Sequence, residues 1–128
     1  MNIELAIADI LANDPNTLEF PSSLGSRYQS GTLPAYTYEI SNMERADLKG
    51  QWVCDLEIRC IDFSLGNAMA LYSYLPAAIV PGTYPLLGGT TITSAIHQGR
   101  TVEPPTVGEG DEREPAEVVA RWSIIFTE

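Results

Sequence analysis

The sequence predicts an α+β fold: one domain, residues 1–128, in which a four-stranded, mostly antiparallel sheet carries two helices on one face, in the order α-β-β-α-β-β. Three observations favour this class. Two segments space their apolar residues as helices do, and four segments alternate apolar and polar residues as strands do. Hydrophobic residues make up 45% of the chain, enough to bury a core and to exclude disorder throughout.

The first helix is expected over residues 2–12 and should end at Asn13-Asp14-Pro15. Its apolar residues recur at helical spacing: Ile3, Ile7, Ile10 and Leu11. Residues 14–34, rich in proline, glycine and serine, are expected to form a loop. The first strand follows over residues 35–40, where tyrosines and Ile40 alternate with polar residues.

The second strand is expected from Trp52 to Phe63, with apolar residues at even positions as far as Cys60. The alternation then changes phase, which predicts a bulge or a strand end near Cys60. Cys54 and Cys60 would lie on one face of this strand, about 20 Å apart at ~3.3 Å per residue. A disulfide needs Cα atoms within about 7 Å, so we expect two buried, unreactive thiols.

Residues 65–80 return to helical spacing, with Asp62 or Ser64 as the candidate cap and Pro76 as the point where the helix kinks or ends. A turn-rich connection over 81–89 leads to a strand over 91–98. In that strand Ile92 and Ile96 should face inward and His97 should face the opposite way.

Residues 99–116 combine prolines and glycines with many charges, so we expect an exposed, mobile loop. Its carboxylates match no calcium-loop spacing: Glu109, Asp111, Glu112 and Glu114. Either the loop only solvates the surface, or it is a flexible arm that becomes ordered against a partner. The last strand is expected from Val118 to the end of the chain.

The charge balance limits the classes of partner. Seventeen acidic residues oppose seven basic ones, giving a net charge of −10. Binding to a phosphate backbone needs clustered Lys and Arg, and Lys49 is the one lysine, so a conventional nucleic-acid surface is not expected. No apolar run approaches the ~20 residues that span a bilayer, and the N-terminus lacks a positive signal-peptide region. We therefore expect a soluble chain that is not exported.

Catalytic and metal-binding patterns are not found. A Ser-His-Asp or Cys-His arrangement would need His97, the one histidine, and no motif surrounds it. The cysteines are too far apart to share a metal. Asp55 and Glu57, at i and i+2 of one strand, indicate a solvated sheet face more than an acid/base pair. We expect no enzyme, no cofactor and no metal.

Two features favour assembly. A small sheet has two edges to protect, and these are natural places for a neighbouring copy. Aromatic residues near loops exceed what so small a core requires, and aromatics are enriched at interfaces: Tyr28, Tyr36, Tyr38, Trp52 and Tyr84.

The order of these elements, and the short motifs at their ends, resemble those of the tail terminator proteins of tailed bacteriophages, also called tail completion or minor tail proteins. The resemblance covers nearly the whole chain through five short segments. They are a helix ending near Asp14-Pro15, Leu33-Pro34 before a strand, Asp62 between a strand and a helix, small beside large residues in Asn67-Ala68-Met69-Ala70-Leu71, and the final Arg121-Trp122-Ser123-Ile124-Ile125-Phe126.

The resemblance implies a ring, typically a hexamer, at the head-proximal end of the phage tail tube. The ring would end tube polymerisation and meet a head-completion or neck protein, while DNA passes through its lumen. It also implies a virion (tail or neck) location after assembly in the host cytoplasm, no catalytic residues and no membrane. Six copies at −10 each would carry −60, and an acidic wall repels phosphates during transit.

The candidate interface or lumen residues are Arg27, Tyr28, Trp52, Arg100, Glu103, Glu109, Asp111, Glu112, Arg113 and Glu114. Three alternatives remain: another head–tail joining protein, an acidic binding module or DNA mimic that occupies a basic protein, and an enzyme that uses His97 or a carboxylate pair. Replacing His97 with Ala would abolish function only if the chain is an enzyme, and would leave function intact in the other cases.

Overall fold

The computed structural model describes residues 2–25, 33–46, 50–85, 89–107 and 113–127. The chain is mostly β, with a mixed six-stranded sheet in the order β1-β2-β3-β8-β5-β4 and a small two-stranded sheet, β6-β7. The strands are β1 Ser22–Leu24, β2 Ala35–Arg45, β3 Gln51–Asp62, β4 Gly82–Tyr84, β5 Thr90–Glu103, β6 Thr106–Val107, β7 Arg113–Glu114 and β8 Ala116–Thr127. The helices are α1 Asn2–Asn13, α2 Leu65–Ser73 and α3 Leu75–Ala78.

The predicted four-stranded α+β fold in the order α-β-β-α-β-β is therefore wrong. The four long strands β2, β3, β8 and β5 form an antiparallel centre, but β1 adds to one side, parallel to β2, and β4 adds to the other. Both added strands are three residues long and lie where a loop or turn was expected. Such short strands show no alternation, because tertiary hydrogen bonds define them.

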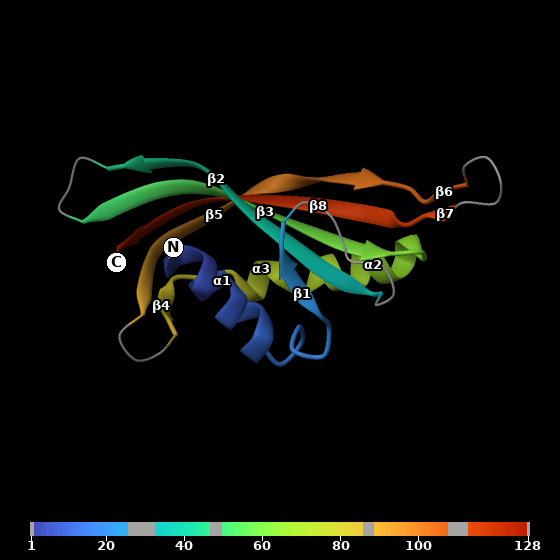
Figure 1. The fold of residues 1–128 in the computed structure, drawn as a ribbon, viewed down its shortest axis with the longest axis horizontal. Helices are drawn as coiled ribbons and strands as arrows, with labels where there is room; N and C mark the ends of the chain where they lie inside the picture. Colours follow the sequence, from blue (N-terminus) through green and yellow to red (C-terminus); the bar gives the residue numbers. More distant parts are fainter. Residues whose placement is uncertain (1, 26–32, 47–49, 86–88, 108–112, 128) are drawn as a thin grey trace.

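The prediction of a loop over residues 99–116 is also wrong for residues 99–107 and 113–116, which the structure describes. Strand β5 continues to Glu103 beside β8, and β6 pairs with β7 beyond it. The ladder hydrogen bonds to β8 hold this segment extended despite its charges. Figure 1 shows the β6–β7 end and the β2–β3 end projecting in opposite directions from the body.

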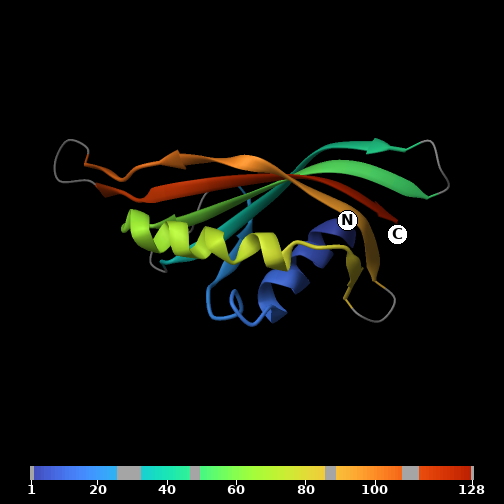
Figure 2. The ribbon, with the colours of Figure 1, turned by 180° about the vertical axis from the view of Figure 1, so that it is seen from behind.

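All three helices cover one face of the twisted sheet (Figures 1 and 2). The even-numbered residues of β3 and β8 face these helices and are buried with the apolar stripe of α1. The largest contributors include Leu56, Ile58, Trp122, Phe126, Ile3, Ile7 and Leu11. Each fully buried side chain of this size contributes ~1.5–3 kcal/mol, so this face supplies the main stabilisation of the fold.

Strand β3 pairs with β8 without a register shift and ends at Asp62, so the phase change near Cys60 marks the strand end and not a bulge. Cys54 and Cys60 are free and buried, as expected. Burial raises the pKa of Cys54 to about 11, with Asp55 adding to the rise, and burial also raises the pKa of Cys60. Neither thiol is poised to react as a thiolate.

The helices begin and end where local chemistry requires. The Ser64 hydroxyl caps α2 by accepting from the Asn67 N–H, as predicted, while the Asp62 carboxylate accepts from the Ser64 N–H at 2.9 Å. Pro76 lies in the first turn of α3, because it cannot continue α2 but fits a helix start. The buried Tyr36 hydroxyl donates to the Leu71 carbonyl at 2.8 Å, which fastens α2 to β2.

The prediction that Ile96 faces inward from β5 and His97 faces the opposite way is wrong. Ile96 is 60% exposed, whereas Ile92 is buried and His97 lies on its side of the sheet, against Trp122. A register shift between Ile92 and Ser94 inserts one residue and reverses the alternation.

Candidate functional site

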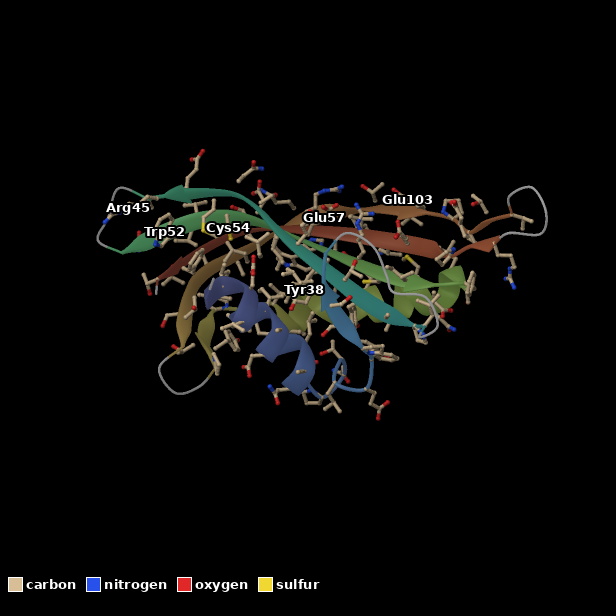
Figure 3. All side chains as sticks on the ribbon, in the orientation of Figure 1. Tyr38, Arg45, Trp52, Cys54, Glu57 and Glu103 are labelled. Carbon is tan, nitrogen blue, oxygen red and sulfur yellow. The ribbon has the colours of Figure 1, made fainter. Side chains whose placement is uncertain are left out.

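The candidate site is the sheet face opposite the helices, which we call the open face. It carries the odd-numbered residues of β3 and β8 and their cross-strand neighbours on β2 and β5. Four of these residues are buried, namely Ala35, Thr37, Ile61 and Val119, and the others are partly or fully exposed. Figure 3 shows Glu57 and Glu103 on this side. Acidic side chains outnumber basic ones along its strands: Glu39, Glu44, Asp55, Glu57, Glu103 and Glu117, against Arg59 and Arg121.

Two arginines organise the centre of the open face. The Arg59 guanidinium contacts Glu117 at 3.2 Å and Glu57 at 3.4 Å. Arg121 contacts Glu57 at 3.2 Å and donates to the Thr101 hydroxyl at 3.1 Å. These groups are partly exposed, so each pair contributes at most about 1 kcal/mol to stability. Their main effect is to hold an acidic, ordered surface in one arrangement.

The surroundings of Glu117 on the open face favour its protonated form. Glu117 lies directly opposite Glu103 across the β5–β8 pairing. Burial raises the pKa of Glu117, and a hydrogen bond and charge repulsion from Glu103 raise it further, while Arg59 acts in the opposite direction. This end of the face therefore holds a proton more readily than an exposed glutamate does.

Two long segments of the sheet edges lack a strand neighbour on their outer side within the described ranges. Strand β1 covers β2 over Tyr36–Tyr38 alone, which leaves Glu39–Arg45, the β2 free segment. Strand β4 covers β5 over Thr90–Ile92 alone, which leaves Thr93–Glu103, the β5 free segment. Each segment contains a register shift, and bulges of this kind limit unspecific pairing at sheet edges.

His97 lies on the helix side of β5, near its free edge. Its Nδ1 accepts from the Gly99 N–H at 3.3 Å, and its Nε2 lies 3.2 Å from the Tyr72 hydroxyl. The ring packs edge-on against Trp122, and the Arg100 guanidinium lies over the Tyr72 ring. Because Nδ1 accepts, the neutral ring carries its proton on Nε2 and donates to Tyr72. These contacts hold β5 against α2.

The structure does not gather the sequence-predicted candidates into one site. Trp52 packs against the core at the start of β3, and Arg100 lies on the helix side over Tyr72. Among the members of the set that the structure describes, Glu103 alone lies on the open face. On β7, Arg113 lies over the Phe63 ring and Glu114 accepts from the Thr106 hydroxyl. Arg27, Tyr28, Glu109, Asp111 and Glu112 lie outside the described residues.

Sequence reasoning missed the network of Arg59, Glu117 and Arg121. The available signal was the charged phase of two strands, seen already in Asp55 and Glu57, but the cross-strand register cannot be read from either strand alone. Across the described residues, no group of three or more His, Cys, Asp or Glu could hold a metal ion. Within the same ranges, no helix is long and apolar enough to cross a membrane.

Neither protein-family models nor curated proteins match this chain.

Proposed function

We propose that this chain is a virion structural protein, a tail terminator that forms a ring at the head-proximal end of a phage tail tube. One observation carries the proposal: an ordered acidic sheet face ends on both sides in long free segments. Free strand edges are natural places for a neighbouring copy, which supports a role in assembly. The ring would end tube polymerisation and join the tail to a head-completion or neck protein.

A head-to-tail interface between copies generates a ring when the rotation closes. The two free segments belong to opposite edges of the same sheet, so they fit a head-to-tail arrangement. With the helices outside, the open face would line the lumen, and its excess carboxylates would repel the phosphates of passing DNA. Such a wall favours transit over binding.

A second function is favoured by a different observation. The carboxylates of the open face lie on ordered strands, as an acidic binding module or DNA mimic requires to occupy a basic protein. Such a module would work as a monomer. A neighbouring role in the neck, as another head–tail joining protein, would also use a ring but with different partners.

Light scattering after size exclusion, over a concentration series, tests the proposal. We expect a discrete species near six times 14.0 kDa, and rings in negative-stain images of that fraction. A strict monomer at every concentration would refute a self-assembling ring and favour the acidic module. Capture of the monomer by a basic protein, weakened by salt, would then support the module.

A further inference from the structure

We infer that the β5 free segment of one copy pairs antiparallel with the β2 free segment of the next copy. The partner is thus a second copy of this chain, and the pairing rests on the ring of the proposed function. It assigns the contact between subunits to one edge-to-edge ladder, Ser94–Gly99 against Glu39–Glu44.

The two segments lie at the same level of the sheet. The cross-strand register runs from Glu39 through Glu57 and Arg121 to Gly99. It runs likewise from Ser41 through Asp55 and Ser123 to Ile96. Two copies placed side by side would therefore bring Glu39–Glu44 and Ser94–Gly99 together with little displacement along the strands. The contact ends there, because β1 lies level with Arg100–Val102 and β4 lies level with Arg45. Strand β5 would bend at the register shift before Gly99 to pass β1 of the next copy.

The strand directions also match. Strands β2, β3, β8 and β5 alternate in direction, so β2 and β5 run antiparallel to one another. A second copy that continues the sheet in the same orientation places its β2 antiparallel to β5 of the first. The alternation then continues around the ring without interruption, and unpaired N–H and C=O groups of both edges are satisfied.

Charge gives this pairing a specific contact. Glu39 lies opposite Glu57, an unfavourable like-charge pair, and among the described residues no ion pair is found for Glu39. In the assembled sheet Glu39 of the next copy would face Gly99 of the first copy. Gly99 has no side chain, so the Glu39 carboxylate would reach across it to Arg121, two strands or about 10 Å away.

A cysteine pair tests the register. Ser41→Cys and Ile96→Cys introduce thiols at exposed positions of the open face that would be opposite one another between copies. Within one copy they are three strand spacings apart, about 14 Å, which is beyond the reach of a disulfide. Mild oxidation should convert most of the protein into disulfide-linked multimers that end at a closed species, visible on non-reducing gels.

The matched control is Ser41→Cys with Thr101→Cys, on the same face but about 13 Å out of level along the strands. We expect this pair to cross-link at least about tenfold less, since disulfide geometry is restrictive. Native Cys54 and Cys60 are buried and should not contribute. A second variant, Glu39→Arg, should weaken assembly severalfold, and adding Arg121→Glu should restore it.

The outcomes separate the two proposals. A ring by light scattering in which Ser41→Cys/Ile96→Cys cross-links no better than the control would overturn the edge pairing and leave the ring in place. A linked ladder without a closed species would support the pairing and refute the ring. A strict monomer without cross-links would overturn both.

Discussion

Replacing Tyr36 with Phe removes one buried hydrogen bond and leaves the packing intact. The Tyr36 hydroxyl donates to the Leu71 carbonyl at 2.8 Å, and its ring packs edge-on against Phe20. Phenylalanine keeps the ring and its aromatic contact. The substitution therefore isolates the bond that fastens α2 to β2.

The expected cost follows from what remains at Leu71. The Tyr74 N–H still donates to the Leu71 carbonyl, at 3.3 Å, so the acceptor is weakened and not orphaned. The loss then lies near the typical net value of one hydrogen bond, about 1 kcal/mol. For a chain of 128 residues this corresponds to a Tm lower by roughly 3–5 °C.

Thermal and urea unfolding, followed by circular dichroism, measure this loss. Tyr84→Phe is the matched control, because its hydroxyl donates to the Val80 carbonyl at an exposed site. It should change the free energy of unfolding by less than about 0.5 kcal/mol. Equal losses in both variants, or no loss for Tyr36→Phe, would refute the assignment of a stabilising role to the Tyr36 bond.

Three further predictions concern the core, the thiols and the open face. Leu56→Ala should lower the free energy of unfolding by about 2–5 kcal/mol in urea titrations, because Leu56 is fully buried; a loss below 1 kcal/mol would contradict its place in the core. A thiol reagent should label Cys54 and Cys60 in the unfolded protein and not in the folded one; rapid labelling of native protein would contradict their burial. Since the pKa of Glu117 is raised in the folded state, its protonated form is favoured there, and its contribution to stability is lost as pH rises from about 4.3 through the folded pKa. The Tm of Glu117→Gln relative to the native chain should therefore rise from pH 4 to pH 7, and a constant difference would refute this sign.

The long elements could be predicted from local pattern, but their assembly could not. Alternation located the centres of β3 and β8, because one side of each strand is buried against the helices. Strands β1 and β4 were not predicted, because a three-residue strand is defined by hydrogen bonds to residues distant in the sequence. The predicted inward direction of Ile96 was wrong for a related reason. An inserted residue before Ser94 reverses the alternation, and no local sequence pattern indicates that insertion.

The contacts between charged residues on the open face were harder to predict than the strands. Prediction chose charged residues by loop composition, such as Arg113 and Glu114, and these lie on a peripheral hairpin. The network that structures the face joins Arg59, Glu117 and Arg121, which come together through the register of β3 with β8. Charge at alternate positions showed which residues avoid the core, but only pairing shows which of them meet.

The stability of the fold and the proposed assembly depend on different faces of the sheet. Residues that face the helices each contribute ~1.5–3 kcal/mol by burial, whereas exposed charges on strands contribute a few tenths to about 1 kcal/mol. Glu39, Ser41 and Ile96 are exposed, so their replacement should leave the fold nearly unchanged. Replacing Arg121 also removes its ion pair with Glu57, which contributes at most about 1 kcal/mol. A change in oligomeric state caused by these substitutions would therefore report on the contact between copies and not on unfolding of one copy. This separation makes the free edges of β2 and β5 the decisive place to test what this chain does.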